Sequence, residues 1–212
     1  MELIKKYFPH LSEKQLQQYA ALKGLYEEWN QKINVISRKD MEYFYEHHVL
    51  HSLAIAMQSK FPAGYHIMDL GAGGGFPGIP LAIYFPEVSF HLVDSINKKL
   101  KVVEAVTHEI ELKNVTVQHT RAEDITGKKF DVVVSRAVAP LKELWYWSKP
   151  LLKKTNNNFK VANGLICLKG GDLSKEIHES GLRPKIWQIS KIFKEDFFKE
   201  KYILSITCCP VN

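Results

Sequence analysis

The feature that most constrains the fold is a glycine-rich turn in the first half of the chain. Glycine occupies positions 71, 73, 74 and 75, directly after the apolar run 66–70. Glycine accepts positive φ angles and has no Cβ atom to keep a ligand away from the backbone. Because four glycines in five positions cost more backbone entropy than a tight turn needs, we interpret this segment as a ligand-binding turn between a strand and a helix.

Short apolar runs alternate with helical patterns along the rest of the chain. This alternation is typical of parallel strands joined by crossover helices, so the sequence predicts an α/β fold with a seven-stranded, mostly parallel sheet. Only about ten residues separate the last two strands, too few for a crossover helix, so we expect the last strand to be antiparallel. The predicted strands are 66–70, 88–93, 115–119, 130–135, 163–169, 185–192 and 201–209. The helices predicted among them are 78–84, 97–111, 140–153 and 172–180.

Two helices are predicted before the sheet begins. The first covers residues 12–29, with Ser12 as its N-cap, and the second covers residues 40–58. We therefore expect a helical extension over residues 1–62 and an α/β domain over residues 63–212, packed together as one compact unit.

Positive charge is concentrated in the last third of the chain. The chain has 29 Lys and Arg against 23 Asp and Glu, and residues 136–212 hold 14 and 7 of these. A basic region favours a polyanionic partner, since each neutralised phosphate releases counterions. A lysine-rich surface that only keeps the protein in solution would have the same composition.

The apolar runs and the cysteines exclude several classes of protein. No run approaches the ~20 apolar residues of a membrane helix, and the N-terminus lacks the apolar stretch of a secretion signal. We therefore expect a cytoplasmic protein without membrane contact. The three cysteines are Cys167, Cys208 and Cys209. This odd number, with two neighbours in sequence, predicts neither a disulfide framework nor a zinc site.

Three histidines lie close together in the predicted helix 40–58. His47 and His51 are four residues apart, which suits chelation of a metal ion, but no third ligand is evident. We therefore expect no metal, and interpret His47, His48 and His51 as packing or RNA-facing residues.

Two classes of cofactor compete for the glycine turn. Gly73-x-Gly75-x-x-Gly78 fits the dinucleotide fingerprint. A pyrophosphate, however, needs free backbone N–H groups at the start of the helix, where Pro77 and Pro80 have none. A nicotinamide cofactor, and with it an oxidoreductase, is therefore disfavoured.

Carboxylates at the strand ends favour S-adenosylmethionine instead. Asp69 precedes the glycines, where it would repel a pyrophosphate and attract, directly or through water, the cationic amino group of S-adenosylmethionine. Asp94 ends the second predicted strand, where a carboxylate accepts both hydroxyls of a ribose. Ala122 and Glu123 follow the third strand, where backbone or carboxylate groups meet the edge of an adenine.

The fourth predicted strand ends in Ser135-Arg136-Ala137, at the edge of the sheet where α/β proteins bind ligands. The Asn/Asp-Pro-Pro-aromatic sequence of methylases that act on exocyclic amines is absent. Cys167 lacks the preceding proline that marks the nucleophile of cytosine C5 methylases. Covalent catalysis is therefore not indicated.

Four segments together carry a family resemblance. They are Asp69-Leu-Gly-Ala-Gly-Gly-Gly-Phe-Pro-Gly-Ile-Pro-Leu81, Val93-Asp94-Ser95, Val134-Ser135-Arg136-Ala137 and Leu168-Lys169-Gly170-Gly171. With them the chain resembles the RsmG (GidB) family of small-subunit ribosomal RNA guanine-N7 methyltransferases. One departure is His51, which lies where many members have aspartate.

The resemblance implies a Rossmann-like class I methyltransferase fold with an N-terminal helical extension. It also implies methyl transfer from S-adenosyl-L-methionine to N7 of a guanine, position 527 in the 530 loop of 16S ribosomal RNA. The partner would then be 16S rRNA or the small ribosomal subunit. From the residues and the resemblance together, the predicted cofactor-binding residues are Asp69, Gly71, Gly73, Gly75, Phe76, Asp94, Ala122, Glu123 and Arg136.

Guanine N7 in RNA carries no proton, so its methylation needs no general base, and we assign no catalytic acid or base. Arg136 and Lys169 are predicted to position the guanine through its O6 atom or a phosphate. Asn34, Arg38 and Lys169 are the candidate RNA contacts. We expect a monomer. The alternatives are a methyltransferase that acts on another RNA or a small molecule, and an RNA-binding module that has lost activity.

Overall fold

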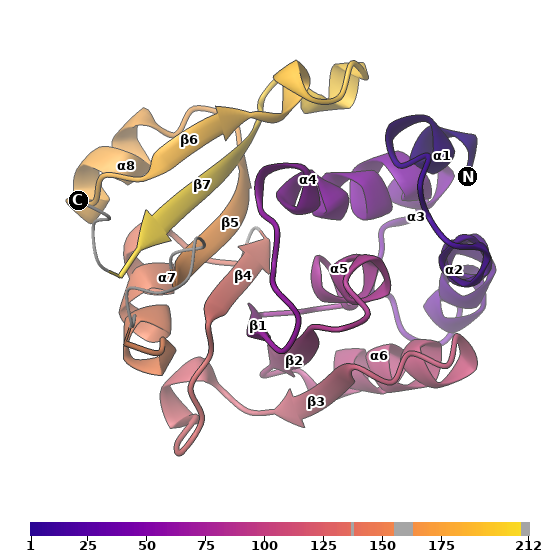
Figure 1. The fold of residues 1–212 in the computed structure, drawn as a ribbon, viewed down its shortest axis with the longest axis horizontal. Helices are drawn as coiled ribbons and strands as arrows, with labels where there is room; N and C mark the ends of the chain where they lie inside the picture. The colour runs from indigo at the N-terminus through magenta and orange to yellow at the C-terminus, as the bar shows by residue number, and fades with distance from the viewer. Residues whose placement is uncertain (137, 155–162, 209–212) are drawn as a thin grey trace.

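A seven-stranded sheet forms the centre of the molecule in a computed structural model, which describes residues 1–136, 138–154 and 163–208. Ala137 and Cys209, both named above, lie outside these residues. The strands are β1 His66–Leu70, β2 Ser89–Asp94, β3 Val115–His119, β4 Val132–Arg136, β5 Gly164–Gly170, β6 Lys185–Gln188 and β7 Lys201–Thr207. The sheet order is β3-β2-β1-β4-β5-β7-β6 (Figure 1).

The first five strands are parallel, and β7 pairs antiparallel with both β5 and β6. This confirms the predicted mostly parallel sheet with an antiparallel last strand. The strand predicted over 185–192 is too long, because β6 ends at Gln188 and a 3-10 turn, η4 Ile189–Lys191, buries Ile189 against the core.

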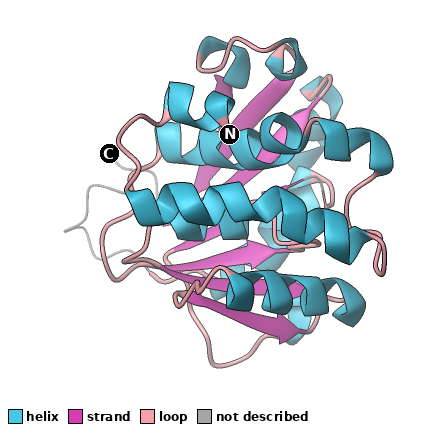
Figure 2. Ribbon diagram, turned by 90° about the vertical axis from the view of Figure 1, so that its right-hand side faces the viewer, coloured by secondary structure: helices cyan, strands magenta, loops and turns pink. Residues whose placement is uncertain are grey.

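Helices cover both faces of the sheet, and Figure 2 shows one helical layer in front of the strands. The helices are α1 Glu2–Tyr7, α2 Glu13–Asn30, α3 Arg38–Glu42, α4 His51–Gln58, α5 Gly78–Tyr84, α6 Asn97–Glu109, α7 Leu141–Ser148 and α8 Ser174–Ser180. The other helical segments are the π-helix η1 Tyr45–Leu50 and the 3-10 turns η2 Ala122–Asp124, η3 Lys149–Leu151 and η5 Asp196–Phe198. Residues that alternate along each strand face opposite sides, so Ile67 packs with α1 to α6 and Met68 packs with α7 and α8.

The N-terminal helices pack against the glycine turn. Ser12 and Gln15 form a capping box that starts α2, as the sequence predicts. The Tyr19 hydroxyl donates to the carbonyl of Pro80 over 2.7 Å, and the Tyr26 hydroxyl donates to the carbonyl of Gly74. Helix α2 thereby supports the backbone of both the turn and α5.

The helix predicted over 40–58 consists of three pieces, α3, η1 and α4. Helix α3 stops at Tyr43, and Phe44 turns inward, where its ring packs 5.4 Å from that of Tyr26 and 5.9 Å from that of Phe76. The wider π-turn that follows carries His47 and His48. Hydrophobic periodicity does not reveal an inserted π-turn, which is often found at functional sites.

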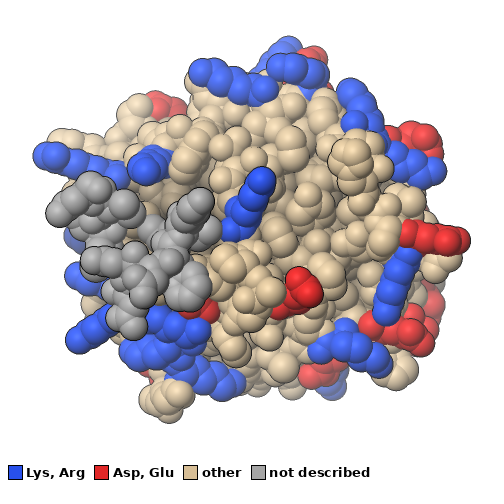
Figure 3. Space-filling view, in the orientation of Figure 1, with Lys and Arg blue, Asp and Glu red and all other residues tan. Residues whose placement is uncertain are grey.

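Charged side chains are unevenly distributed on the surface. On the face in Figure 3, lysines and arginines lie mainly around the rim, mixed with acidic residues, and few lie near the centre. Among the described residues, no helix is long and apolar enough to span a membrane.

Candidate functional site

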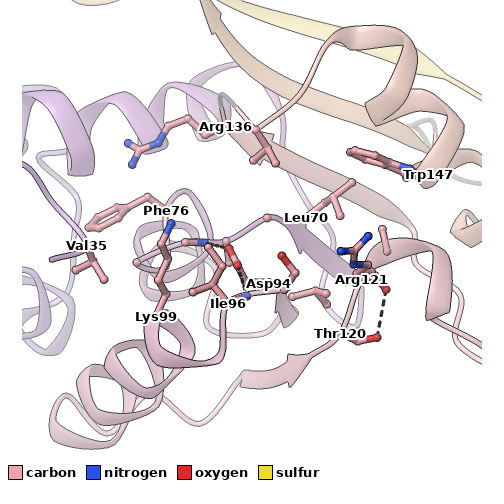
Figure 4. A pocket seen from close by; sticks show the side chains of 18 of the residues that line it. Val35, Leu70, Phe76, Asp94, Ile96, Lys99, Thr120, Arg121, Arg136 and Trp147 are labelled. Carbon is pink, nitrogen blue, oxygen red and sulfur yellow. Dashed lines mark hydrogen bonds between the residues drawn. The ribbon is translucent and has the colours of Figure 1, made fainter. Parts of the chain in front are cut away.

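A cavity of about 510 Å³ opens at the carboxyl ends of β1, β2 and β4 (Figure 4). It lies where the strand order reverses, because the chain goes from β1 to β2 on one side while β4 flanks β1 on the other. Crevices at such switch points are the usual ligand sites of open α/β sheets. The lining residues are Val35, Leu70, Gly71, Ala72, Gly73, Gly74, Phe76, Val93, Asp94, Ser95, Ile96, Lys99, Thr120, Arg121, Ala122, Glu123, Arg136, Val138 and Trp147.

The glycine turn forms the floor of this cavity. Gly71 has a φ of +69°, and a Cβ atom there would lie 2.6 Å from Cγ2 of Val138. Gly73 has a φ of +56°, but a Cβ atom there would meet no described atom within 4 Å. The absence of a side chain at Gly73 therefore keeps space open above the turn rather than avoiding a clash within the protein.

Asp94 joins the end of β2 to the turn. Its Oδ2 accepts the N–H of Gly73 and its Oδ1 accepts the N–H of Ile96, both over 2.8 Å (Figure 4). A carboxylate oxygen can accept more than one hydrogen bond, so both oxygens of Asp94 can accept a further one from a ligand in the cavity. The predicted site for ribose hydroxyls is thus held in place by two backbone contacts.

Asp69 lies beneath the turn rather than in the cavity lining. Its Oδ2 accepts the N–H of Gly78 over 2.7 Å, and its buried Oδ1 has no hydrogen-bond partner among the described residues. Burial raises the pKa of this carboxyl to about 7. Of the two predicted modes, direct or through water, the structure does not place Asp69 among the lining residues that direct contact with a cofactor needs.

Gly75 is also outside the lining. A Cβ atom at this position would lie 2.5 Å from Cδ1 of Ile79, so this glycine allows the turn to pack closely on α5.

Arg136 lies on the wall of the cavity beside Phe76 (Figure 4). Its Nη1 donates to the carbonyl of His47 over 3.3 Å, and its Nη2 donates to Nδ1 of His48 over 3.1 Å. The guanidinium carbon lies 5.0 Å from the centre of the Phe76 ring. Burial lowers the pKa of Arg136 to about 10, so the group stays charged at neutral pH.

His48 is the acceptor that orients Arg136. Burial, reinforced by the nearby charge of Arg136, lowers the pKa of His48 to about 3, so the ring is neutral and its Nδ1 accepts. Sequence analysis did not assign this contact, because it depends on the π-turn that carries His48. His51 packs edge-on against Phe197 and Phe198, with ring centres 5.5 and 6.0 Å away.

The opposite wall comes from η2 and α7. Ala122 and Glu123 line it together with Trp147, which lies across the cavity from Phe76 in Figure 4. Val35, Ile96, Lys99 and Trp147 are lining residues that the sequence analysis did not identify. Val35 and Trp147 come from elements whose approach to the cavity depends on tertiary packing, and Ile96 and Lys99 follow the end of β2.

The three candidate RNA contacts lie in different surroundings. Asn34 is exposed on the segment between α2 and α3, next to the lining residue Val35, and Arg38 is exposed at the start of α3. Lys169 is buried, and its ammonium donates to Oε1 of Glu176 and to the carbonyl of Ala139, both over 2.6 Å. Lys169 therefore stays outside the cavity and holds the backbone that follows β4.

Comparison with known proteins matches the chain to one family over most of its length. The family model described as GidB, rRNA small subunit methyltransferase G, matches residues 12–201. The ribosomal RNA small subunit methyltransferase G of Phocaeicola vulgatus is 55% identical over 207 residues, with 98% of each chain covered. That of Flavobacterium psychrophilum is 50% identical over 206 residues, with 97% of each chain covered.

A solved structure shares the fold at low identity. A mutant of MtNAS in complex with S-adenosylmethionine is 15% identical, with a TM-score of 0.57, and the match covers 92% of this chain and 76% of that one. This likeness supports the Rossmann-like arrangement of sheet and helices.

Proposed function

Because the chain belongs to the rRNA small subunit methyltransferase G family, we propose that it transfers a methyl group from S-adenosyl-L-methionine to N7 of guanine 527, in the 530 loop of 16S rRNA. The observation that carries the proposal is the family match over residues 12–201, joined to a cavity whose floor is the glycine turn. The substrate would be 16S rRNA or the small ribosomal subunit. We also propose that the protein acts in the cytoplasm as a monomer.

The residues of the cavity fit S-adenosylmethionine. Its volume of about 510 Å³ lies within the ~300–1,000 Å³ of small-molecule sites. Asp94 has acceptor capacity for the two ribose hydroxyls, and the open space above Gly73 admits a ligand against the backbone. Ala122 and Glu123 supply a wall for the adenine.

The methionine end of the cofactor would lie toward Gly71 and Phe76. Both residues line the cavity at the carboxyl end of β1. Asp69, one layer below, contributes negative charge through the turn when it is ionised, rather than a direct hydrogen bond.

When bound, S-adenosylmethionine supplies a methyl group on a positively charged sulfur. The target N7 has a lone pair and no proton, so the chain has to align this atom and has no proton to remove. Arg136 is suited to this alignment because the guanidinium has five N–H donors, of which His47 and His48 take two. A remaining donor faces guanine O6 or a phosphate.

Asn34 and Arg38 are the proposed contacts to the RNA backbone. Both are exposed: Asn34 precedes the lining residue Val35 in the chain, and Arg38 starts α3 three residues after it. An arginine in this place forms paired hydrogen bonds to a phosphate of the RNA that enters. Lys169 would act indirectly, by holding the carbonyl of Ala139 next to the lining residue Val138.

The test is methyl transfer from radiolabelled S-adenosylmethionine to small ribosomal subunits and to naked 16S rRNA, both from a strain without this protein. We expect label on one guanine, located at N7 in the 530 loop by cleavage of the 7-methylguanosine site. Subunits from the parent strain, which already carry the methyl group, are the control and should take up no label. Label at another nucleotide or only on a small molecule, despite calorimetric binding of the cofactor, would contradict the proposed substrate.

A further inference from the structure

Three rings form a stacked column beside the cavity. The rings of Tyr43 and His47 are 5.0 Å apart, and those of His47 and Phe197 are 3.9 Å apart, with interplanar angles of 15° in both pairs. The ammonium of Lys201 lies 5.0 Å from the centre of the Phe197 ring. The column therefore runs from Tyr43 at one end to a lysine at the other.

The column is attached to the wall of the cavity. The backbone carbonyl of His47 accepts a hydrogen bond from Arg136, which lines the cavity. The side chain of His47 is fixed from another direction, because its Nδ1 lies 3.0 Å from Oδ1 of Asp40. His47 therefore belongs to the column through its ring and contacts the wall of the cavity through its backbone.

Tyr43 differs from the inner rings of the column in its exposure. Its side chain is 50% exposed, whereas His47 and Phe197 are partly buried. An aromatic ring of this size costs free energy when it is left half in water, and a single exposed tyrosine is common on protein surfaces. Tyr43, however, is the end of an ordered stack, so a further planar group placed on it would continue a geometry that is already built.

The surroundings of Tyr43 suit a nucleic acid. Tyr43 ends the short helix α3, and Arg38 and Lys39 lie exposed about one turn earlier on the same helix. The segment before α3 contains the lining residue Val35. The segment that continues from this lining residue therefore offers an approaching RNA strand two cations and an aromatic ring.

We propose that Tyr43 is a stacking platform for an unpaired RNA base that neighbours the methylated guanine, with His47 and Phe197 as the layers beneath it. The inference rests on the proposed function and adds a subsite to it. Recognition of RNA loops depends on unstacked bases that lie on aromatic side chains, and such a contact tolerates any base because every base has a π face. Stacking would hold the flanking nucleotide and so add to the affinity of the enzyme for the RNA.

A purely structural role for the column would involve its inner members instead. His47 joins η1 to η5 through Phe197 at 3.9 Å, and these two rings remain in contact when Tyr43 is shortened. Substitution of Tyr43 therefore removes the proposed platform while the connection between the N-terminal helices and the C-terminal strands persists.

The experiment compares Tyr43→Phe, Tyr43→Leu and Tyr43→Ala in the full chain. The readouts are the Kd for unmethylated small subunits, the KM and kcat of methylation, and the affinity for S-adenosylmethionine. We expect Tyr43→Phe to match the wild type, and Tyr43→Leu and Tyr43→Ala to raise Kd and KM between about 5-fold and 100-fold. Affinity for S-adenosylmethionine and kcat should stay within about 2-fold, since neither depends on the platform.

Tyr146→Ala is the matched control. Tyr146 is 74% exposed on α7 and lies outside the cavity lining, so its loss should leave every readout unchanged. The slope of log Kd against log salt should be the same in Tyr43→Ala and the wild type, because stacking involves no phosphate. A reduced slope would mean that the variant displaces Arg38 or Lys39, and would overturn the inference.

Other outcomes separate this inference from the proposed function. Wild-type KM and Kd in Tyr43→Leu would overturn the platform, because leucine keeps the bulk and lacks the π face. A wild-type enzyme that binds small subunits but methylates none of them would contradict the proposed function, while the Kd of the variants still decides whether Tyr43 stacks on a base.

Discussion

The carboxylate of Asp69 accepts the N–H of Gly78 over 2.7 Å beneath the glycine turn, and a side chain at Gly78 would remove the space that the carboxylate occupies. An ideal Cβ atom at Gly78 would lie 2.7 Å from Oδ2 of Asp69 and 2.9 Å from the side chain of Leu92. The glycine thus permits a buried acidic group at the end of β1, and this group has a measurable effect on stability.

We expect the Asp69→Asn variant to become more stable relative to the wild type as pH rises. The folded pKa of Asp69 is about 7 against an ordinary value of 3.8, so between these values the folded protein retains a proton that the unfolded chain releases. Wild-type stability therefore falls with rising pH in this window, and the loss is complete above about pH 7. Unfolding by urea at pH 4 and at pH 8 gives the free energy of unfolding of both proteins. From pH 4 to pH 8, the difference between them should change by up to ~4 kcal/mol in favour of Asp69→Asn. An equal difference between the two proteins at both pH values would contradict this.

His48 has the opposite dependence on pH. The folded pKa of His48 is about 3 against an ordinary value of 6.5, so between these values the unfolded chain binds a proton that the folded protein does not. Stability is lost as pH falls below about 6.5. His48→Gln keeps an acceptor for Arg136 but does not titrate. Between pH 7 and pH 5, its free energy of unfolding should fall by about 2 kcal/mol less than that of the wild type. If denaturation experiments show the same loss of stability in both proteins, the wild-type histidine is protonated in the folded protein.

Gly73→Val should abolish the binding of S-adenosylmethionine. The valine would occupy the space above the turn, and we expect the affinity measured by calorimetry to fall by roughly 100-fold or more. Gly64→Val is the matched control, because Gly64 has a φ of +80° and similarly open surroundings but lies outside the cavity lining. Both variants carry a similar backbone strain of ~1–3 kcal/mol, and only Gly73→Val should lose the cofactor. Equal cofactor affinities in the two variants would exclude the turn as the cofactor site.

Lys169→Met should destabilise the protein by about 3 kcal/mol, because it leaves the partly buried carboxylate of Glu176 without its partner. The double variant Lys169→Met/Glu176→Gln should recover at least ~1 kcal/mol, since the amide oxygen still accepts from the N–H of Leu141. Unfolding by denaturant measures both the destabilisation of the single variant and the recovery in the double variant. If Lys169→Met instead unfolds like the wild type and only turnover falls, Lys169 acts on the RNA and not through Glu176.

The sheet was predictable because each strand carries a local signal. His66–Leu70 is a mostly apolar, buried run, and the edge strand Val115–His119 alternates valine with polar residues, so both have the predicted bounds. The start of α2 was predictable for a similar reason, because the capping box of Ser12 and Gln15 is local. Helix α1 was not predicted, since a six-residue helix has little stability alone and here depends on the burial of Ile4 and Phe8.

The candidate site was predictable at strand ends and less so elsewhere. Gly71, Gly73 and Asp94 line the cavity because their place follows from the parallel order of β1 and β2. The orientation of Asp69 did not follow, because a carboxylate at a strand end points toward the cavity or beneath the turn according to the space left by Gly78. The partner of Lys169 was equally hidden, since Glu176 is brought near only by the packing of α8.

The contact of Tyr26 with the glycine turn has a consequence for genetics. Tyr26 lies far from the turn in sequence, yet its hydroxyl holds the carbonyl of Gly74 and its ring lies 5.0 Å from that of Phe76. A screen for strains that have lost the activity should therefore recover substitutions in α2. Such alleles would resemble defects of the cofactor site, although the mutated helix side chain does not line the cavity.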